Sequence, residues 1–200
     1  MDTRTAITTR RAIRKFDPAH VIAETEIREM LSLAMLAPTA FNIQHWRFVV
    51  VKDGALRERI REACARQPQI TEASLLVVIC ADVKAWMKSP ARYWENAPGA
   101  ARESLLEGIR SHYEGREQFQ VDEAMRSCGM AAQTLMLAAQ SMGYSSSPMD
   151  LGDPGAVAEL IGLPQDHVIA MYVAIGKGIA EPFPRGGQLP YEEVVRIDRF

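Results

Sequence analysis

The chain has 200 residues, of which 48% are hydrophobic and 24% charged, and its 23 basic and 25 acidic residues give a formal net charge of −2. This balance offers no electrostatic attraction for nucleic acid or an anionic membrane, so any anion must be bound locally. The length suits one hydrophobic core, and we expect a single domain over residues 1–200. The three cysteines lie far apart and no histidine stands at metal-ligand spacing. This pattern indicates neither a zinc site nor a disulfide framework, and it predicts a cytoplasmic protein without a bound metal.

The first predicted element is a short helix over residues 4–15 that carries a cluster of basic side chains. Arg10 and Arg14 would lie one turn apart on the same face, with Arg11 turned aside, and Asp17-Pro18 would end the helix. Guanidinium groups match the geometry of phosphate oxygens, so the cluster is a candidate phosphate site. Two alternatives are a solvated surface helix and an organellar presequence, although the chain runs directly into the next helix start.

Helices and strands alternate in the next part of the chain. Apolar residues at helical spacing predict a helix over residues 25–36. Residues 46–51 and 75–81 are nearly continuous apolar runs, which are typical of central strands covered on both faces. An amphipathic helix over residues 56–64 lies between them, so this region predicts a strand, a helix and a strand.

The polar loop at residues 38–44, PTAFNIQ, carries two primary amides, Asn42 and Gln44, two positions apart. Each amide offers a donor and an acceptor in one plane, which suits the edge of a planar heterocycle. Taken alone, each could equally be an ordinary turn residue or an exposed polar residue. Together with the basic cluster, the pair favours a ligand site.

The second half of the chain begins with residues 83–120, which combine aromatic residues with many charges and two prolines. We expect this segment to be a partly helical excursion over the active site or a dimer interface. Residues 121–142 predict a long helix that is apolar around most of its circumference and therefore central to the fold or to a dimer interface. The most hydrophobic long segment, residues 129–143, falls short of the roughly 20 apolar residues that a membrane span requires.

The remaining elements are a short helix, a strand and an irregular tail. Asp153 and Pro154 supply an N-cap and a first-turn proline, and Gly162 closes the helix. Residues 167–175 predict a third strand, and the tail after it is rich in glycine and proline. The chain contains no nucleophile or metalloprotease motif and neither a dinucleotide-binding glycine motif nor a P-loop. If a phosphate is bound, arginines must bind it.

Four segments, in order over almost the whole chain, resemble the nitroreductase family of FMN-dependent NAD(P)H oxidoreductases. They are RRAIRKFD, APTAFNIQHWRFVVV, CGMAAQTLMLAAQSMGYSSSPMD, and VAIGKGIAEPFPR followed by PYEEVV. The resemblance implies an α+β fold with a central mixed, mainly antiparallel β-sheet flanked by helices, a long central helix, and a C-terminal arm exchanged in a homodimer. It also implies FMN at the subunit interface and NADPH or NADH as the reductant. The substrates would be nitroaromatics, quinones or related small electrophiles, reduced by ping-pong hydride transfer through flavin N5.

The resemblance assigns cofactor contacts to matching positions of this sequence. One group would bind the FMN phosphate and the pyrimidine side of the flavin: Arg10, Arg11, Arg14, Arg185 and Ala12, the last in place of the usual serine. A loop group would reach the flavin bound mainly by the other subunit: Pro38, Thr39, Ala40, Asn42 and Gln44. A third group would approach flavin N5: Pro148, Met149, Asp150 and Leu151, where Asp and Leu replace the usual Glu and Gly. Arg66 or Gln69 would lie near flavin N1 and O2.

The resemblance leaves the substrate-contacting residues and the exact reaction open. Candidates for stacking on substrate are Phe41, Trp86, Tyr93 and Trp94, which could instead pack in the core or in a dimer interface. A related flavoprotein of the same fold could use reduced FMN for dehalogenation or flavin breakdown. A third alternative is a non-catalytic flavin carrier or sensor. We expect a small-molecule oxidant and neither nucleic acid, membrane nor metal as a partner.

Overall fold

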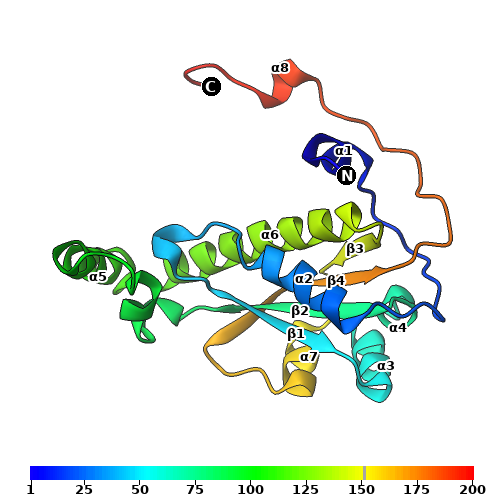
Figure 1. Cartoon of the computed structure of the whole chain (residues 1–200), viewed down its shortest axis with the longest axis horizontal. Coiled ribbons are helices and arrows are strands. Elements are labelled where there is room, and N and C mark those ends of the chain that lie inside the picture. Colours follow the sequence, from blue (N-terminus) through cyan, green and yellow to red (C-terminus); the bar gives the residue numbers. More distant parts are fainter. Residues whose placement is uncertain (151) are drawn as a thin grey trace.

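The computed structural model describes residues 1–150 and 152–200. Within them, four strands form one sheet in the order β1 (Trp46–Val51), β2 (Leu75–Asp82), β4 (His167–Gly176) and β3 (Ser145–Met149) (Figure 1). All neighbouring strands are antiparallel. Every residue of β2 is buried, as expected for a central strand rich in β-branched residues. The three predicted strands are therefore confirmed, within one residue at their ends. The expectation that residues 46–51 form a central strand covered on both faces is wrong, because β1 lies at the edge of the described sheet and its four middle residues are only partly buried.

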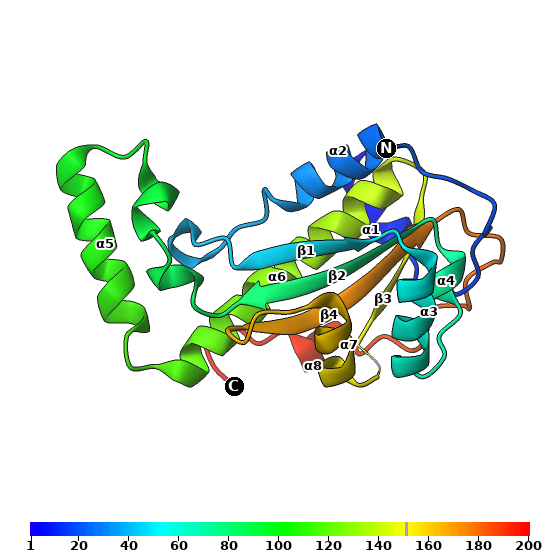
Figure 2. The same cartoon turned by 90° about the horizontal axis from the view of Figure 1, so that it is seen from below.

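Helices cover both faces of the sheet. The long α6 (Glu117–Ser141) and α2 (Glu24–Ala34) pack on one face, and α3 (Gly54–Ala63) and α7 (Pro154–Ile161) pack on the other (Figures 1 and 2). The buried side of α6 consists largely of alanines, which let the helix backbone approach the sheet closely. As predicted, Asp153 caps α7 and Gly162 ends it in the left-handed region, with φ 64°. The expected α+β fold with a long central helix is confirmed.

The predicted helix over residues 4–15 is too long. The helix α1 (Thr3–Thr9) ends before the arginines, and the chain continues extended, with ψ 129° at Arg10. Ala12 forms a parallel bridge with Ser146, and the amide of Ile13 donates to the Ser146 carbonyl at 3.1 Å. These pairings with the edge strand β3 outweigh the weak helix preference of the segment. Arg10 and Arg14 therefore do not share a helix face.

Strand β3 is not predicted by the sequence. Its polar serines and Pro148 look like a loop in the sequence. A proline is nevertheless compatible with a strand at the edge of a sheet, and β3 is an edge strand of the four. β3 contacts the N-terminal segment that carries the arginines at Ser146, and Pro148 and Met149 follow in the same strand.

Residues 83–120 are helical to a large extent and project from one end of the sheet (Figure 2). They contain the 3-10 helices η2 (Ala85–Met87) and η3 (Pro90–Trp94), helix α5 (Gly99–Tyr113) and the start of α6. Three further short elements lie in loops or the tail: η1 (Ala40–Asn42), α4 (Gln69–Glu72) and α8 (Tyr191–Val194). No helix in residues 1–150 or 152–200 combines the length and apolarity that crossing a bilayer needs.

Candidate functional site

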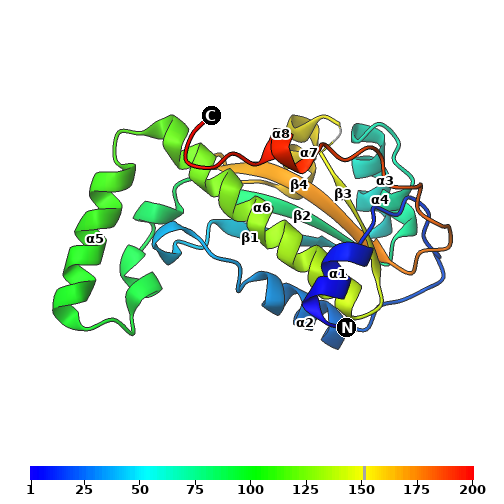
Figure 3. The same ribbon diagram turned by 90° about the horizontal axis from the view of Figure 1, so that it is seen from above.

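The N-terminal arginine segment lies against the chain that follows β4, at one end of the sheet (Figure 3). Phe16 forms an antiparallel bridge with Gly178. The tail then returns to the arginines, because Arg185 Nη2 donates to the Thr8 carbonyl at 2.7 Å and to the Arg10 carbonyl at 3.3 Å. Arg11 donates to the carbonyl of Phe183. The fold thus brings the predicted cations Arg10, Arg11 and Arg185 to one place, with Arg14 exposed on the same segment.

The turn between α3 and α4 distinguishes the two candidates for the flavin N1 and O2 position. Arg66 has φ 56°, and its side chain is 76% exposed and pairs with Glu62 at 2.9 Å. Gln69 is 3% exposed, and its Nε2 donates to Gln67 Oε1 at 3.1 Å. The backbone of the turn directs Arg66 outward, so Gln69 is the better placed of the two to meet a buried ligand.

The segment after β3 contacts the end of α3 through Gly152 and Asp153. Asp150 is exposed, and Leu151 lies outside the described residues. At Gly152, φ is 119° and a Cβ atom would lie 2.5 Å from the Ala63 carbonyl oxygen, so only glycine fits. The amide of Asp153 donates to the same Ala63 carbonyl at 2.9 Å. Gly152 and Asp153 thereby hold this part of the chain against the end of α3, where the turn toward Gln69 begins.

Several buried polar atoms around this end of the sheet have no hydrogen-bond partner among the described residues, among them Arg10 Nη1, Gln69 Oε1 and Ser146 Oγ. Ile13, Ile70 and Met149, each within three positions of one of these residues, belong to one hydrophobic cluster. Leaving a buried donor or acceptor unsatisfied costs about 1–3 kcal/mol per group. A ligand that carries both a phosphate and a polar heterocycle would satisfy such a set, so these residues fit FMN. The sequence analysis did not identify Ser146, whose only sequence signal is its place before the Pro-Met pair.

The amide loop at residues 38–44 lies at the opposite end of the sheet, beside α5 and far from α3 and α4 (Figure 2). Phe41, Asn42 and Gln44 have φ values of 51°, 54° and 54°, in the left-handed region that residues with side chains rarely adopt. Gln44 Nε2 lies 3.3 Å from Asn42 Oδ1, and Asn42 Nδ2 donates to the Tyr93 carbonyl at 3.0 Å. Both predicted ligand amides are thus partly engaged within the protein.

A groove of about 560 Å³ lies along this loop. Its lining includes four of the predicted loop residues: Pro38, Thr39, Asn42 and Gln44. Ala40, the fifth, begins η1 beside them. One chain therefore supplies two separated groups of predicted cofactor residues, one at each end of its sheet.

The aromatic residues proposed to contact substrate fall into two classes. Trp86 and Tyr93 are only 9% and 8% exposed and pack with Tyr113 in an aromatic cluster formed by Ile43, Ala85, Trp86, Tyr93, Ile109 and Tyr113. The rings of Trp86 and Tyr113 stack with their centroids 5.9 Å apart. Trp86 and Tyr93 thus pack inside the excursion. Phe41 and Trp94 are half-buried against the cluster and remain candidates.

His45, next to the amide loop, is a buried histidine. Its Nδ1 lies 3.1 Å from Ser127 Oγ, and its Nε2 has no partner within the part of the chain that the structure describes. Burial lowers the pKa of His45 to about 4, although the negative charge of Asp82 acts in the opposite direction. His45 is therefore neutral at physiological pH and is not a proton donor.

Comparisons with known proteins agree on one family. The sequence profile of the nitroreductase family matches residues 7–177. The chain is 52% identical to Protein DrgA of Synechocystis sp., over 88% of this chain and 84% of DrgA. It is 31% identical to the NADH dehydrogenase of Thermus thermophilus, over 98% of this chain and 95% of that protein. A crystal structure from Exiguobacterium sibiricum, in complex with FMN, matches with a TM-score of 0.91 and 25% identity, over 98% of this chain and 97% of that one. As its sequence motifs and its fold indicated, this chain belongs to the nitroreductase family.

Proposed function

We propose that the protein is an FMN-dependent oxidoreductase that uses NADPH or NADH to reduce nitroaromatics, quinones or related small electrophiles. Membership of the nitroreductase family makes it an enzyme, and the FMN complex and the NADH dehydrogenase among the proteins it resembles support both cofactors. The main support for FMN binding is that buried polar atoms of Arg10, Gln69 and Ser146 have no hydrogen-bond partner among the described residues.

Each residue group has a separate task in binding FMN, which when bound supplies the hydride chemistry at its N5 atom. Arg10, Arg11, Arg14 and Arg185 bind the phosphate, and Ala12 lies beside it. Gln69, rather than Arg66, faces flavin N1 and O2. Pro148, Met149 and Asp150 line the N5 edge. An uncharged amide at Gln69 stabilises negative charge on N1 less than a cation would, so we expect a lower flavin reduction potential than with lysine at this position.

In this proposal the active enzyme is a homodimer. The reason is that the loop at residues 38–44 and the arginine segment lie at opposite ends of the sheet within one chain (Figure 2). In a dimer, the loop of one subunit can complete the flavin site of the other. The exposed apolar side chains of the tail support an exchanged arm. They are Ile179, Phe183, Leu189, Tyr191, Val194, Val195, Ile197 and Phe200. In such a dimer, Phe41 and Trp94 would contact a substrate above the flavin. The proposed location of the enzyme is the cytoplasm, where the nicotinamide is available.

Steady-state kinetics with two varied substrates test this proposal. The rate is measured over a range of NADPH or NADH concentrations at several fixed concentrations of a nitroaromatic, a quinone or an enone. A single open flavin face accepts one partner at a time, so parallel double-reciprocal lines are expected. Intersecting lines would contradict the ping-pong order. A yellow protein that shows no turnover with any member of the panel would favour the flavin carrier.

A further inference from the structure

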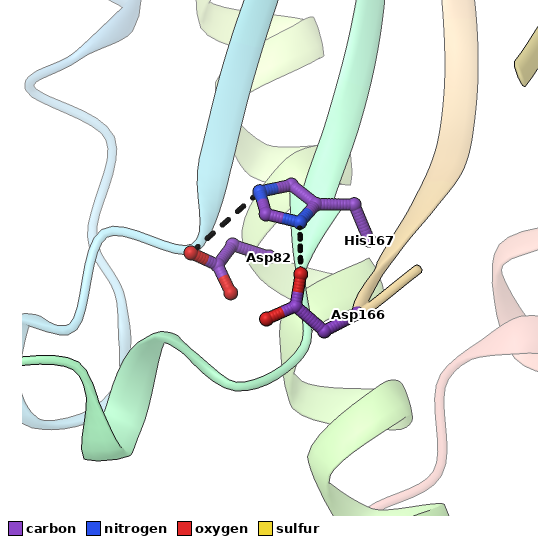
Figure 4. Close-up of side chains that lie close together, drawn as sticks. All are labelled: Asp82, Asp166 and His167. Carbon is purple, nitrogen blue, oxygen red and sulfur yellow. Dashed lines mark hydrogen bonds and ion pairs between the residues drawn. The ribbon is translucent and has the colours of Figure 1, made fainter. Parts of the chain in front are cut away.

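A group of charged residues lies where β2 ends and the helical excursion begins (Figure 4). We call Arg47, Asp82, Lys88, Asp166 and His167 the Asp82 network. Its central carboxylate, on Asp82, is 2% exposed, whereas the side chains of Arg47 and Lys88 are 36% and 40% exposed. A buried carboxylate of this kind is retained in a fold only when its partners compensate the cost of burial.

Within the network, positively charged side chains pair with the carboxylates of Asp82 and Asp166. Asp82 Oδ2 accepts from Arg47 Nη2 at 3.0 Å, and Asp82 Oδ1 accepts from Lys88 Nζ at 2.9 Å. Lys88 Nζ also lies 2.6 Å from Asp166 Oδ2. His167 lies between the two acids, with Nδ1 2.7 Å from Asp166 and Nε2 3.7 Å from Asp82 (Figure 4).

This arrangement favours a structural role over a metal site. Ligand atoms of Asp82, Asp166 and His167 all lie within 4.8 Å of one another. The ammonium group of Lys88, however, already contacts both carboxylates, and the guanidinium of Arg47 supplies a second positive charge. Two cations therefore match two anions without an added ion.

Arg47 connects Asp82 directly to the amide loop. While its Nη2 pairs with Asp82, its Nη1 donates to the carbonyls of Gln44 and Trp46, at 2.8 Å each. The guanidinium is planar, so fixing one nitrogen on a buried carboxylate fixes the direction of the other. The Gln44 carbonyl, at a residue with φ 54°, is held in place by this contact.

Lys88 connects Asp82 to the helical excursion at residues 83–120. This excursion also contacts the amide loop at residues 38–44, through η3. Lys88 lies between η2 and η3, and η3 ends at Trp94. The indole Nε1 of Trp94 donates to the Phe41 carbonyl at 3.0 Å, and the Tyr93 carbonyl accepts from Asn42 Nδ2 at 3.0 Å. The left-handed residues Phe41 and Asn42 are thus each fixed by a contact from η3.

We propose that Asp82 is a positioning residue that holds Phe41, Asn42 and Gln44 in their left-handed conformation, through Arg47 on one side and through Lys88 and η3 on the other. A strained backbone persists only where surrounding contacts determine it, and each of the three left-handed residues has such a contact. The catalytic consequence rests on the proposed function, in which this loop completes the flavin site of the partner subunit. Asp82 itself does not touch the flavin.

Hydrogen exchange of the full-length protein, saturated with FMN, tests the inference. Asp82→Asn removes the charge that orients Arg47 and Lys88, so the amides of Asn42 and Gln44 should exchange about tenfold faster. Amides of β2 and α3 should keep their exchange rates. Asp166→Asn is the matched control, because it leaves the contact between Asp82 and Arg47 intact, and it should accelerate loop exchange by less than about threefold. Equal acceleration throughout the protein, or an unchanged loop, would overturn the inference.

Flavin binding provides the second readout. Asp82→Asn should raise the dissociation constant of FMN about tenfold, and Arg47→Met should add little in the Asp82→Asn background, because both act on the same contact. Fully additive effects would contradict the proposed route through Arg47.

If Asp82→Asn does not fold, Lys88→Met and Trp94→Phe each remove one connection and should still accelerate exchange at residues 41–44. If nicotinamides do not reduce the wild-type protein, the proposed function fails, whereas the exchange data still decide the role of Asp82.

Discussion

At the scale of single residues, Arg10 is the strongest link between the sequence and the proposed flavin site. Its Nη1 is buried and lacks a partner within residues 1–150 and 152–200. A charge-assisted hydrogen bond is worth about 1.5–3 kcal/mol, so Arg10→Ala should weaken FMN binding by roughly 10- to 100-fold. Fluorescence titration of the FMN-free protein measures this change. Lys15→Ala is the control, since Lys15 is exposed on the same segment, and equal losses in both variants would contradict the phosphate role.

His45 should make the stability of the protein depend on pH. Its pKa in the folded protein is about 4, below the ordinary value of 6.5, because burial disfavours the charged ring. The unfolded chain therefore binds a proton between pH 6.5 and 4 that the folded protein does not, so this contribution to stability is present above pH 6.5 and is lost as pH falls through 4. Between pH 7 and pH 5 the free energy of unfolding should fall by about 2 kcal/mol from this residue.

Urea unfolding of the wild type and of His45→Asn at both pH values isolates that contribution. The asparagine keeps a polar contact to Ser127 but does not titrate, so the variant should lose about 2 kcal/mol less than the wild type between pH 7 and pH 5. An identical pH dependence in the two proteins would show that the pKa of His45 is the same in the folded protein as in the unfolded chain.

At the scale of elements, the connection from β3 to α7 depends on one glycine. A Cβ atom at position 152 would meet the Ala63 carbonyl oxygen at 2.5 Å and the Cα of Cys64 at 2.6 Å, and φ there is 119°. Gly152→Ala should therefore destabilise the protein by about 2 kcal/mol or more and disturb the adjoining flavin segment. Thermal unfolding measures the loss. Gly54→Ala, at a position with open space around it, should have little effect, and two equally stable variants would refute the argument.

Sequence patterns predict some of these elements and not others. The strands predicted at 46–51 and 75–81 could be found from their apolar and β-branched residues, but only the second run reflects complete burial in the sheet, since β1 is an edge strand. Strand β3 could not be predicted, since its serines and proline become a strand only through pairing with β4 and Ala12. The same limit applies to the site. The residue types at positions 10–14 and 42–44 indicated a ligand, but whether Arg66 or Gln69 faces inward depends on the left-handed turn between α3 and α4.

At the scale of the whole molecule, the tail should control assembly. Residues 181–200 lie largely in solvent, and α8 and the C-terminus stand away from the body of the chain (Figure 1). Deleting them removes Arg185 and all the exposed apolar side chains of the tail except Ile179, so the variant should be monomeric and should retain little FMN. Sedimentation velocity and the flavin-to-protein absorbance ratio measure the two effects. A stable dimer with a full flavin content would contradict an exchanged arm.

The central claim is that bound FMN passes electrons from a nicotinamide to a small oxidant. Anaerobic titration of the FMN-loaded protein with NADPH and with NADH tests it most directly, by following the visible absorbance of the oxidised flavin. We expect complete bleaching by about one equivalent of at least one nicotinamide per flavin, and recovery of the absorbance on adding a nitroaromatic or a quinone. A flavin that stays oxidised with both nicotinamides would show that bound FMN does not accept hydride from a nicotinamide.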